Sequence, residues 1–146
     1  LISALDTADL VIGSRYVPGG EVEGWSAWRL ALSRGGNRYA RTMLRLPVQD
    51  ATGGFRAFRA SVLRELNLAD ISSAGYCFQV DLAWRTWRGG YDIVEVPIAF
   101  TERVRGRSKM SSSIVGEALV QVGWWGVRHR SRGARARAIA TRKGRS

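Results

Sequence analysis

The sequence predicts an α/β fold, and three observations indicate it. Ala8–Ile12 is a short apolar run followed by Gly13, which is the pattern of a buried strand. Asp92–Phe100 is the clearest strand pattern in the chain. Segments of helical character lie between these two runs, and strands that alternate with helices are typical of α/β proteins.

The first half of the chain is expected to hold one long helix. Leu1–Asp6 has the pattern of a helix end, and Val17–Gly20 predicts a loop. Ser26 is placed to cap a helix that runs to about Arg45 and that Pro47 ends. Three rows of side chains are expected along this helix. An apolar face is formed by Trp28, Leu32, Tyr39 and Met43, and a basic row by Arg34, Arg38, Arg41 and Arg45. Arg29 and Ser33, four residues apart, are neighbours in the third row.

The second half is expected to alternate between short elements. Pro97 should place its strand at a sheet edge or at the strand's end. About three strands are visible in all, which is too few for a doubly wound sheet, so we expect the chain, which starts at Leu1 and not at Met, to be part of a larger domain. The remaining elements are a loop and strand over Asp50–Arg59, helices over Ser61–Leu66, Tyr76–Arg88 and Ile114–Val127, a basic loop over Thr101–Met110, and a disordered tail over His129–Ser146.

Charge is distributed unevenly along the 146 residues, which carry a net charge of +11. Residues 1–100 are nearly neutral, at +1, whereas residues 101–146 carry +10. A single cysteine, Cys77, excludes an internal disulfide framework and a cysteine-based zinc cluster. No apolar run reaches the ~18 residues that a membrane-spanning helix needs. The composition therefore predicts a globular protein whose carboxyl-terminal part meets anionic partners.

Arginines are the strongest candidates for site residues, because the usual catalytic sets are missing. The one histidine, His129, lies in the tail, and neither Gly-x-x-x-x-Gly-Lys nor Gly-x-Gly-x-x-Gly occurs. Arg15 directly follows a buried strand, and Arg56 follows Gly53-Gly54. Arginine suits phosphate because its planar guanidinium donates two parallel hydrogen bonds. The alternative for each arginine is an ordinary solvated charge, and it is weakest for Arg15.

Six segments occur in an order that resembles the polyprenol (dolichol) phosphate mannosyltransferases, which are inverting enzymes of glycosyltransferase family 2 with the GT-A fold. Residues 1–127 carry the resemblance. Two of the segments also occur in polyprenyl-phosphate glucosyl- and aminosugar transferases that use UDP-sugars. The identity of the transferred sugar therefore stays open. The segments are Asp9–Gly20 (with Gly-Ser-Arg-Tyr), Arg29-x-x-x-Ser33-Arg-Gly-x-Asn37, Asp50-x-Thr-Gly-Gly-Phe-Arg56, Gly75-Tyr-x-Phe-Gln79, Val94–Ile98 and Arg103-x-x-Gly-x-Ser-Lys109.

The resemblance implies transfer of mannose from GDP-mannose to a polyprenyl phosphate. It implies a fold that is the C-terminal portion of a Rossmann-like GT-A domain, with residues 1–127 as the acceptor-side half and 128–146 as a basic tail. The nucleotide and a divalent cation, Mg²⁺ or Mn²⁺, would be held by an N-terminal half with an Asp-x-Asp motif. No Asp-x-Asp occurs here, so this chain is expected to hold no metal and to be inactive alone.

By position in the motifs, the acceptor phosphate would be bound by Arg15, Arg29, Ser33 and Arg103, and Lys109 would add charge. The nucleophile is a phosphate oxygen, already anionic at neutral pH, so cations that position it are needed more than a general base.

Further residues are candidates to line this site. Asp50 either touches substrate or caps the turn at Thr52, and Gln79 and Asp81 lie on a helix that could face the site. The relatives usually carry a glutamate near Asp81. Arg56 is a fourth candidate, whereas Trp84, Trp87 and Cys77 are expected in the core.

The helix over Ile114–Val127 has a wide apolar face with Trp124 and Trp125, and a basic tail follows it. Tryptophan and basic residues favour a membrane interface, so we expect an amphipathic helix that lies on a membrane. The resemblance implies a peripheral enzyme on the cytoplasmic face, with a membrane-anchoring protein among its partners. The alternative is a helix packed on the sheet as core.

Nucleic-acid binding is the rival from another class, because the pI is about 11.3 and the tail is rich in arginine. The nearly neutral globular part and the lack of aromatic residues interleaved with basic ones argue against it. No nucleic-acid partner is therefore expected.

Overall fold

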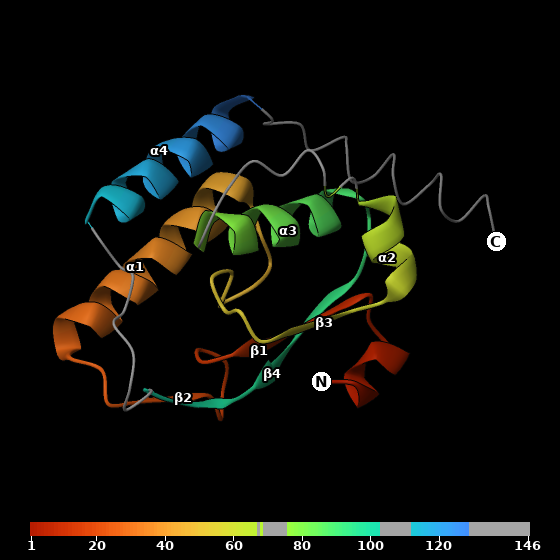
Figure 1. Cartoon of the computed structure of the whole chain (residues 1–146), viewed down its shortest axis with the longest axis horizontal. Helices are drawn as coiled ribbons and strands as arrows, with labels where there is room; N and C mark the ends of the chain where they lie inside the picture. The colour runs from red at the N-terminus through yellow and green to blue at the C-terminus, as the bar shows by residue number, and fades with distance from the viewer. Residues whose placement is uncertain (67, 69–75, 103–111, 129–146) are drawn as a thin grey trace.

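The computed structural model describes residues 1–66, 68, 76–102 and 112–128, whose arrangement is shown in Figure 1. One sheet has β1 (Leu10–Ser14) in the middle, between β3 (Arg56–Phe58) and β4 (Ile93–Pro97). β1 pairs in parallel with β4 and antiparallel with β3. A second sheet pairs β2 (Glu21–Glu23) in parallel with β5 (Ala99–Thr101). The α/β class predicted from the sequence is confirmed.

β1 is the central strand, and all five of its residues are buried. Leu10 lies opposite Ile93 of β4 and opposite Phe58 of β3. A strand enclosed in this way carries a near-continuous apolar run, which is the pattern that predicted it. Gly13 is required by close approach, because a Cβ there would lie 2.8 Å from Cδ1 of Phe55.

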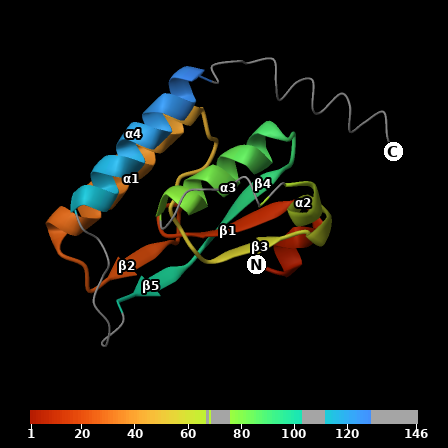
Figure 2. The same cartoon turned by 45° about the horizontal axis from the view of Figure 1, so that its top comes forward.

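Three helices, α1, α3 and α4, lie on one side of the strands, and α4 runs alongside α1 (Figure 1, Figure 2). The core forms between β1 and these helices, where burial of apolar surface is the main favourable term in folding. The described helices are the 3₁₀ turn η1 (Ser3–Asp6), α1 (Ala27–Leu44), α2 (Ala60–Glu65), α3 (Tyr76–Arg88) and α4 (Ser112–Arg128). The core includes Leu10, Ile12, Ala40, Leu44, Val80, Ala83, Trp84 and Val122.

The ends of α1 are within one residue of those predicted. Ser26 stands at the N-cap in an extended conformation, but its side chain makes no capping hydrogen bond. Arg45 is left-handed, with φ of 54°, and ends the helix before Pro47. The backbone amide of Leu46 donates to the carbonyl of Arg41 and closes the last turn.

The apolar face predicted for α1 is wrong in part. Trp28 is 68% exposed, while Tyr39 and Met43 are only partly buried. The reason is that α1 packs against two neighbours, the sheet and α4, so its apolar surface is divided between them. The buried residues of α1 are Asn37, Ala40 and Leu44.

Glycines allow α4 to approach α1 closely. A Cβ at Gly123 would lie 2.6 Å from the Tyr39 hydroxyl, and one at Gly126 would lie 2.7 Å from the carbonyl of Met43. The Tyr39 hydroxyl donates to the carbonyl of Leu119 at 3.0 Å. These contacts place α4 on the helix that carries Arg29 and Ser33, so α1 joins the candidate site to α4.

The strand count differs from the prediction, since five strands are described and only about three were expected. The predicted strand Asp92–Phe100 is divided between β4 and β5, with Ile98 between them. Ile98 donates to the carbonyl of Ser14 and accepts from the amide of Glu21, which leads the chain from one sheet to the other. Pro97 is the last residue of β4, as expected.

Candidate functional site

Arg15 stands at the carboxyl end of β1 and makes a buried ion pair with Asp50. Its Nε donates to Oδ2 and its Nη2 to Oδ1, both at 2.7 Å, and its backbone amide donates to Oδ2 at 3.1 Å. Asp50 is fully buried and Arg15 is 8% exposed. A paired charge-assisted contact of this kind fixes the position and plane of the guanidinium.

Asp50 is the counter-ion of Arg15, a role that the sequence did not indicate. Burial by itself would raise the pKa of Asp50, but hydrogen bonds and charge from Arg15, with a hydrogen bond from Thr52, lower that pKa below its usual value. The Thr52 hydroxyl also donates to Oδ1 at 3.2 Å, while the Thr52 backbone amide, which a turn cap would engage, donates to Asn37. Asp50 therefore stays ionised at neutral pH.

The loop that carries Asp50 is held from two sides. Glu95 of β4 accepts from the backbone amides of Gln49 at 2.6 Å and Asp50 at 2.8 Å. Asn37 of α1 accepts from the Thr52 amide at 3.2 Å and donates to the Thr52 hydroxyl at 3.1 Å. These contacts make the carboxylate a rigid partner for Arg15.

Arg56 fastens this loop to α3. Its guanidinium donates to the backbone carbonyls of Gly53, Ala51 and Gln79, each at 2.6 Å. Burial lowers the pKa of Arg56 to about 10, which the charges of Asp50 and Glu95 counter in part. Arg56 therefore remains charged at neutral pH and supports the loop that holds Asp50.

Arg29 lies in the first turn of α1 and faces Trp25. Its guanidinium carbon is 4.3 Å from the centre of the Trp25 ring, and Nη1 forms an ion pair with Glu102. The guanidinium carbon of Arg15 lies 5.2 Å from the centre of the same ring. Trp25 also packs edge-on against Phe100 at 5.5 Å between ring centres. The tryptophan thus brings together two arginines that the motifs predicted as ligands of one phosphate.

Ser33 completes the group on the next turn of α1. Its hydroxyl accepts from the Tyr16 hydroxyl at 2.7 Å. The Tyr16 ring centre lies 5.2 Å from the Arg15 guanidinium carbon, so Ser33 is linked to Arg15 through Tyr16. We refer to Arg15, Tyr16, Trp25, Arg29 and Ser33 as the acceptor cluster.

The other predicted site residues have separate positions. Gln79 and Asp81 lie on α3, where the Gln79 carbonyl accepts from Arg56 and the buried Asp81 pairs with Arg85 at 2.8 Å. Arg103 and Lys109 lie outside the described residues, as does the tail over residues 129–146.

Sequence reasoning missed Tyr16, Trp25 and Glu102. Tyr16 belongs to the Gly-Ser-Arg-Tyr motif, and Glu102 is the single acid in the basic segment over residues 101–110. The motif and the isolated acid were therefore signals in the sequence that could have pointed to Tyr16 and Glu102. Trp25 had no such signal, because only the folded chain brings its ring close to two arginines. Its indole Nε1 is buried and has no hydrogen-bond partner among the residues that the structure describes.

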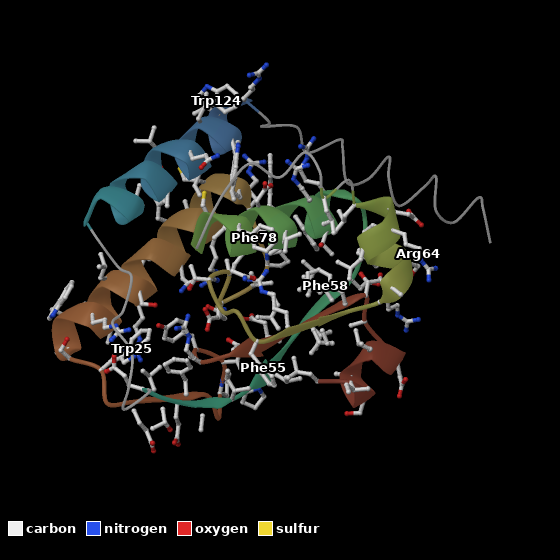
Figure 3. The ribbon with its side chains drawn as sticks, viewed as in Figure 1. Trp25, Phe55, Phe58, Arg64, Phe78 and Trp124 are labelled. Carbon is white, nitrogen blue, oxygen red and sulfur yellow. The ribbon has the colours of Figure 1, made fainter. Side chains whose placement is uncertain are left out.

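Helix α4 divides its tryptophans between two environments. Trp125 stacks on Trp84 of α3, with ring centres 5.7 Å apart and planes 11° from parallel. Trp124 is 55% exposed, points away from α1 in Figure 3, and has the Arg128 guanidinium carbon 4.5 Å from its ring centre. The sequence left two alternatives for this helix, a helix on a membrane and a helix packed as core. Val122 and Trp125 pack in the core, and the membrane alternative stays a prediction. Other exposed apolar residues of α4 are Leu119, Val120 and Val127.

No described helix is both long enough and apolar enough to cross a membrane. No three His, Cys, Asp or Glu side chains of the described chain gather where they could hold a metal ion.

Two curated proteins resemble nearly the whole chain. It is 51% identical over 131 residues, 89% of its length, to a polyprenol monophosphomannose synthase of Mycolicibacterium smegmatis. It is 54% identical over 137 residues, 94% of its length, to an undecaprenyl-phosphate mannosyltransferase of Micrococcus luteus. No protein-family model matches the chain.

The matched regions are 49% of the first relative and 56% of the second, so the chain spans about half the length of each. Identity of this level, over nine-tenths of the chain, confirms the resemblance that the six motifs predicted. Over that half of their length, the chain is a homologue of the polyprenyl-phosphate mannosyltransferases.

Proposed function

We propose that the protein transfers mannose from GDP-mannose to a polyprenyl phosphate, with inversion, and that this chain binds the acceptor phosphate. The observation that carries the proposal is that Arg15 and Arg29 approach one Trp25 ring, with Ser33 linked to Arg15 through Tyr16. The names of the two relatives support the acceptor class and the sugar. The donor nucleotide comes from the family resemblance alone.

The two arginines would do different work. Arg15 is buried, and Asp50 fixes it in place, so it offers a rigid positive edge. Arg29 is partly exposed and is paired with Glu102, whose side chain is 39% exposed. A phosphate can replace this carboxylate, because it carries more negative charge and more acceptor oxygens. Arg29 would then orient an anionic phosphate oxygen toward the sugar, and no general base is required.

The proposed domain is the acceptor-side part of a GT-A fold, over residues 1–127. The family resemblance supports placing the ligands of a Mg²⁺ or Mn²⁺ ion, and the GDP-mannose site, in the part of the relatives that this chain does not span. The chain alone would then be inactive.

The proposed location is the cytoplasmic face of a membrane, with a membrane-anchoring protein as a partner. The exposed apolar residues of α4, above all Trp124 and Val120, support contact with lipid. Residues 128–146, which carry eight Lys or Arg, would add attraction to anionic headgroups.

The direct test uses the complete protein with a panel of donors and acceptors. GDP-mannose and UDP-glucose are each supplied with a polyprenyl phosphate or with the corresponding polyprenol. We expect mannose transfer to the phosphate only, with a product that chemical analysis shows to be polyprenyl-phosphate-mannose. Transfer from UDP-glucose instead would favour the other branch of the family, and transfer to the free alcohol would contradict the acceptor assignment.

A further inference from the structure

A second group of arginines lines a cavity that the acceptor cluster does not account for. The cavity has a volume of about 650 Å³ and lies between α1, the Tyr16–Gly20 loop and Gln49. Its guanidinium groups come from Arg34, Arg38 and Arg41 of α1, with Arg15 at one wall. We call Arg34, Arg38, Arg41 and Gln49 the arginine pocket.

The helix period explains why the three arginines meet. Positions 34, 38 and 41 are four and three residues apart, which places their side chains along one line of α1. That line leaves Ala40 and Leu44 to face the core. Like charges at this spacing repel one another, so a stripe of three arginines gives up some helix stability unless an anion neutralises it.

The charge of the pocket is unbalanced within the described part of the chain. None of the described residues that line it is acidic. Glu95 contacts the lining residue Gln49, but its carboxylate accepts from the backbone amides of Gln49 and Asp50. Asp50 is engaged by Arg15. The positive charges of Arg34, Arg38 and Arg41 are therefore the ones available to a ligand.

The pocket is partly organised before any ligand arrives. Nη1 of Arg41 donates to the side-chain oxygen of Gln49, and the Arg34 guanidinium carbon lies 5.7 Å from the centre of the Tyr16 ring. Nε of Arg41 is buried and has no hydrogen-bond partner among the described residues. A buried donor without an acceptor is costly, and an anion in the pocket would supply that acceptor.

Gly20 shapes the opposite wall. A Cβ at this position would lie 2.7 Å from the carbonyl oxygen of Ser14 and 2.9 Å from that of Arg15, so only glycine fits without a shift. The backbone amide of Gly20 donates to the carbonyl of Val17 at 2.8 Å and closes the turn. The tight turn holds the loop against the end of β1 and leaves the cavity open beside α1.

We propose that the arginine pocket binds a phosphate-bearing anion of the size and charge of a diphosphate, at a site beside the acceptor cluster, with which the cavity shares Arg15 and Tyr16. Three guanidinium groups match an anion with two to three negative charges, and the cavity is larger than a single phosphate requires. Neither Arg29 nor Ser33 lines the pocket. Tyr16 stands between the two sites, with its hydroxyl on Ser33 and its ring near Arg34. The anion could come from solution or from the headgroup of an anionic lipid.

Inorganic pyrophosphate is the probe for the soluble source, and binding is measured by calorimetry on the whole 146-residue chain. We expect Arg38→Ala and Arg41→Gln each to weaken pyrophosphate binding about tenfold, the loss of one charge-assisted hydrogen bond. Arg64→Ala is the matched control, because Arg64 is an exposed arginine of α2, on the far side of the molecule from α1 in Figure 3. This variant should bind as the wild type does.

Vesicles of phosphatidylglycerol, with phosphatidylcholine vesicles as control, test the lipid source with the same variants. The lipid source is supported if Arg38→Ala and Arg41→Gln weaken vesicle binding, Arg64→Ala does not, and the chain does not bind pyrophosphate. This result would support the pocket and assign the anion to a lipid headgroup. The proposal is overturned if the folded chain binds neither probe, or if Arg64→Ala loses as much as the pocket variants. It is also overturned if Arg29→Ala abolishes pyrophosphate binding while Arg38→Ala leaves it intact, because the anion would then lie at the acceptor cluster.

Discussion

Arg29 and Glu102 form an ion pair although 73 residues separate them in the chain. Arg29 belongs to α1, and Glu102 directly follows β5. The Glu102 carboxylate is therefore paired with the guanidinium that the motifs predict to bind the acceptor phosphate. In the absence of acceptor, Glu102 takes the place that we propose for a phosphate oxygen.

Replacing Glu102 by glutamine should strengthen binding of the acceptor. The pair is partly exposed, so its worth is at most about 1 kcal/mol, which corresponds to an increase of up to about fivefold in affinity for polyprenyl phosphate. The measurement is the KM for polyprenyl phosphate in the complete protein, with the KM for GDP-mannose as internal reference. Glu21→Gln, an exposed acid of β2, is the control. An acceptor KM that is unchanged or higher in Glu102→Gln would contradict the competition.

Arg29→Ala and Ser33→Ala should raise the KM for polyprenyl phosphate and leave that for GDP-mannose unchanged. Each variant loses a hydrogen bond to an anionic phosphate, which predicts a rise of about tenfold or more in the acceptor KM for both. Tyr16→Phe is the informative comparison, because it removes the hydroxyl that donates to Ser33 and keeps the ring. It should raise the acceptor KM less than Ser33→Ala does, because the Ser33 hydroxyl is still present but is no longer held by Tyr16. Equal effects on donor and acceptor would point to misfolding and not to loss of a ligand.

The Arg15–Asp50 pair should dominate the stability of the region. Removing one partner leaves a buried charge uncompensated, which costs ~3–5 kcal/mol in the free energy of unfolding. We expect Asp50→Asn and Arg15→Met each to show a loss of this order in urea denaturation. The double variant should lose less than the two single losses added together, because it leaves no lone charge. Additive losses would show that the two side chains do not act as a pair.

Low pH should reduce the free energy of unfolding, because it protonates the Asp50 carboxylate. The pKa of folded Asp50 is lowered by Arg15, below the ~3.9 expected in the unfolded chain. The unfolded state therefore takes up the proton first, and stability is lost as the pH falls from about 4 through the folded pKa. Urea denaturation at a series of pH values should show this loss in the wild type and a shallower one in Asp50→Asn. Parallel curves for the two proteins would exclude Asp50 as the cause.

Adjacent tryptophans of α4 offer a matched pair for the membrane proposal. Trp124→Ser should weaken binding to anionic vesicles while changing the free energy of unfolding little, because the ring is 55% exposed. Trp125→Ser should instead destabilise the fold by ~2–4 kcal/mol, because it removes the ring that stacks on Trp84. Vesicle co-sedimentation and thermal unfolding separate the two effects. Unchanged vesicle binding by Trp124→Ser would contradict the proposed lipid contact.

Elements with a strong local pattern were predictable. Helix α3 lies over Tyr76–Arg88 as predicted, and β1 was visible as an apolar run before Gly13. Strand β2 was not visible, because Glu21–Glu23 is three residues long and carries two acids. Its pairing with β5 depends on a partner 78 residues away, which no local pattern reports. The exposure of Trp28 was missed for a similar reason, since periodicity shows that a face is apolar but not which neighbour covers it.

The sequence by itself determined the α/β class and, through six ordered motifs, the family and the arginines predicted to bind the acceptor phosphate. It could do so because motif residues and strand patterns are local properties of the chain. The tertiary structure decided the partners of those residues: Asp50 for Arg15, Glu102 for Arg29 and Tyr16 for Ser33. It also decided that a row of α1 arginines lines a cavity. Such pairings join distant segments, and only the packed fold brings their side chains within contact distance.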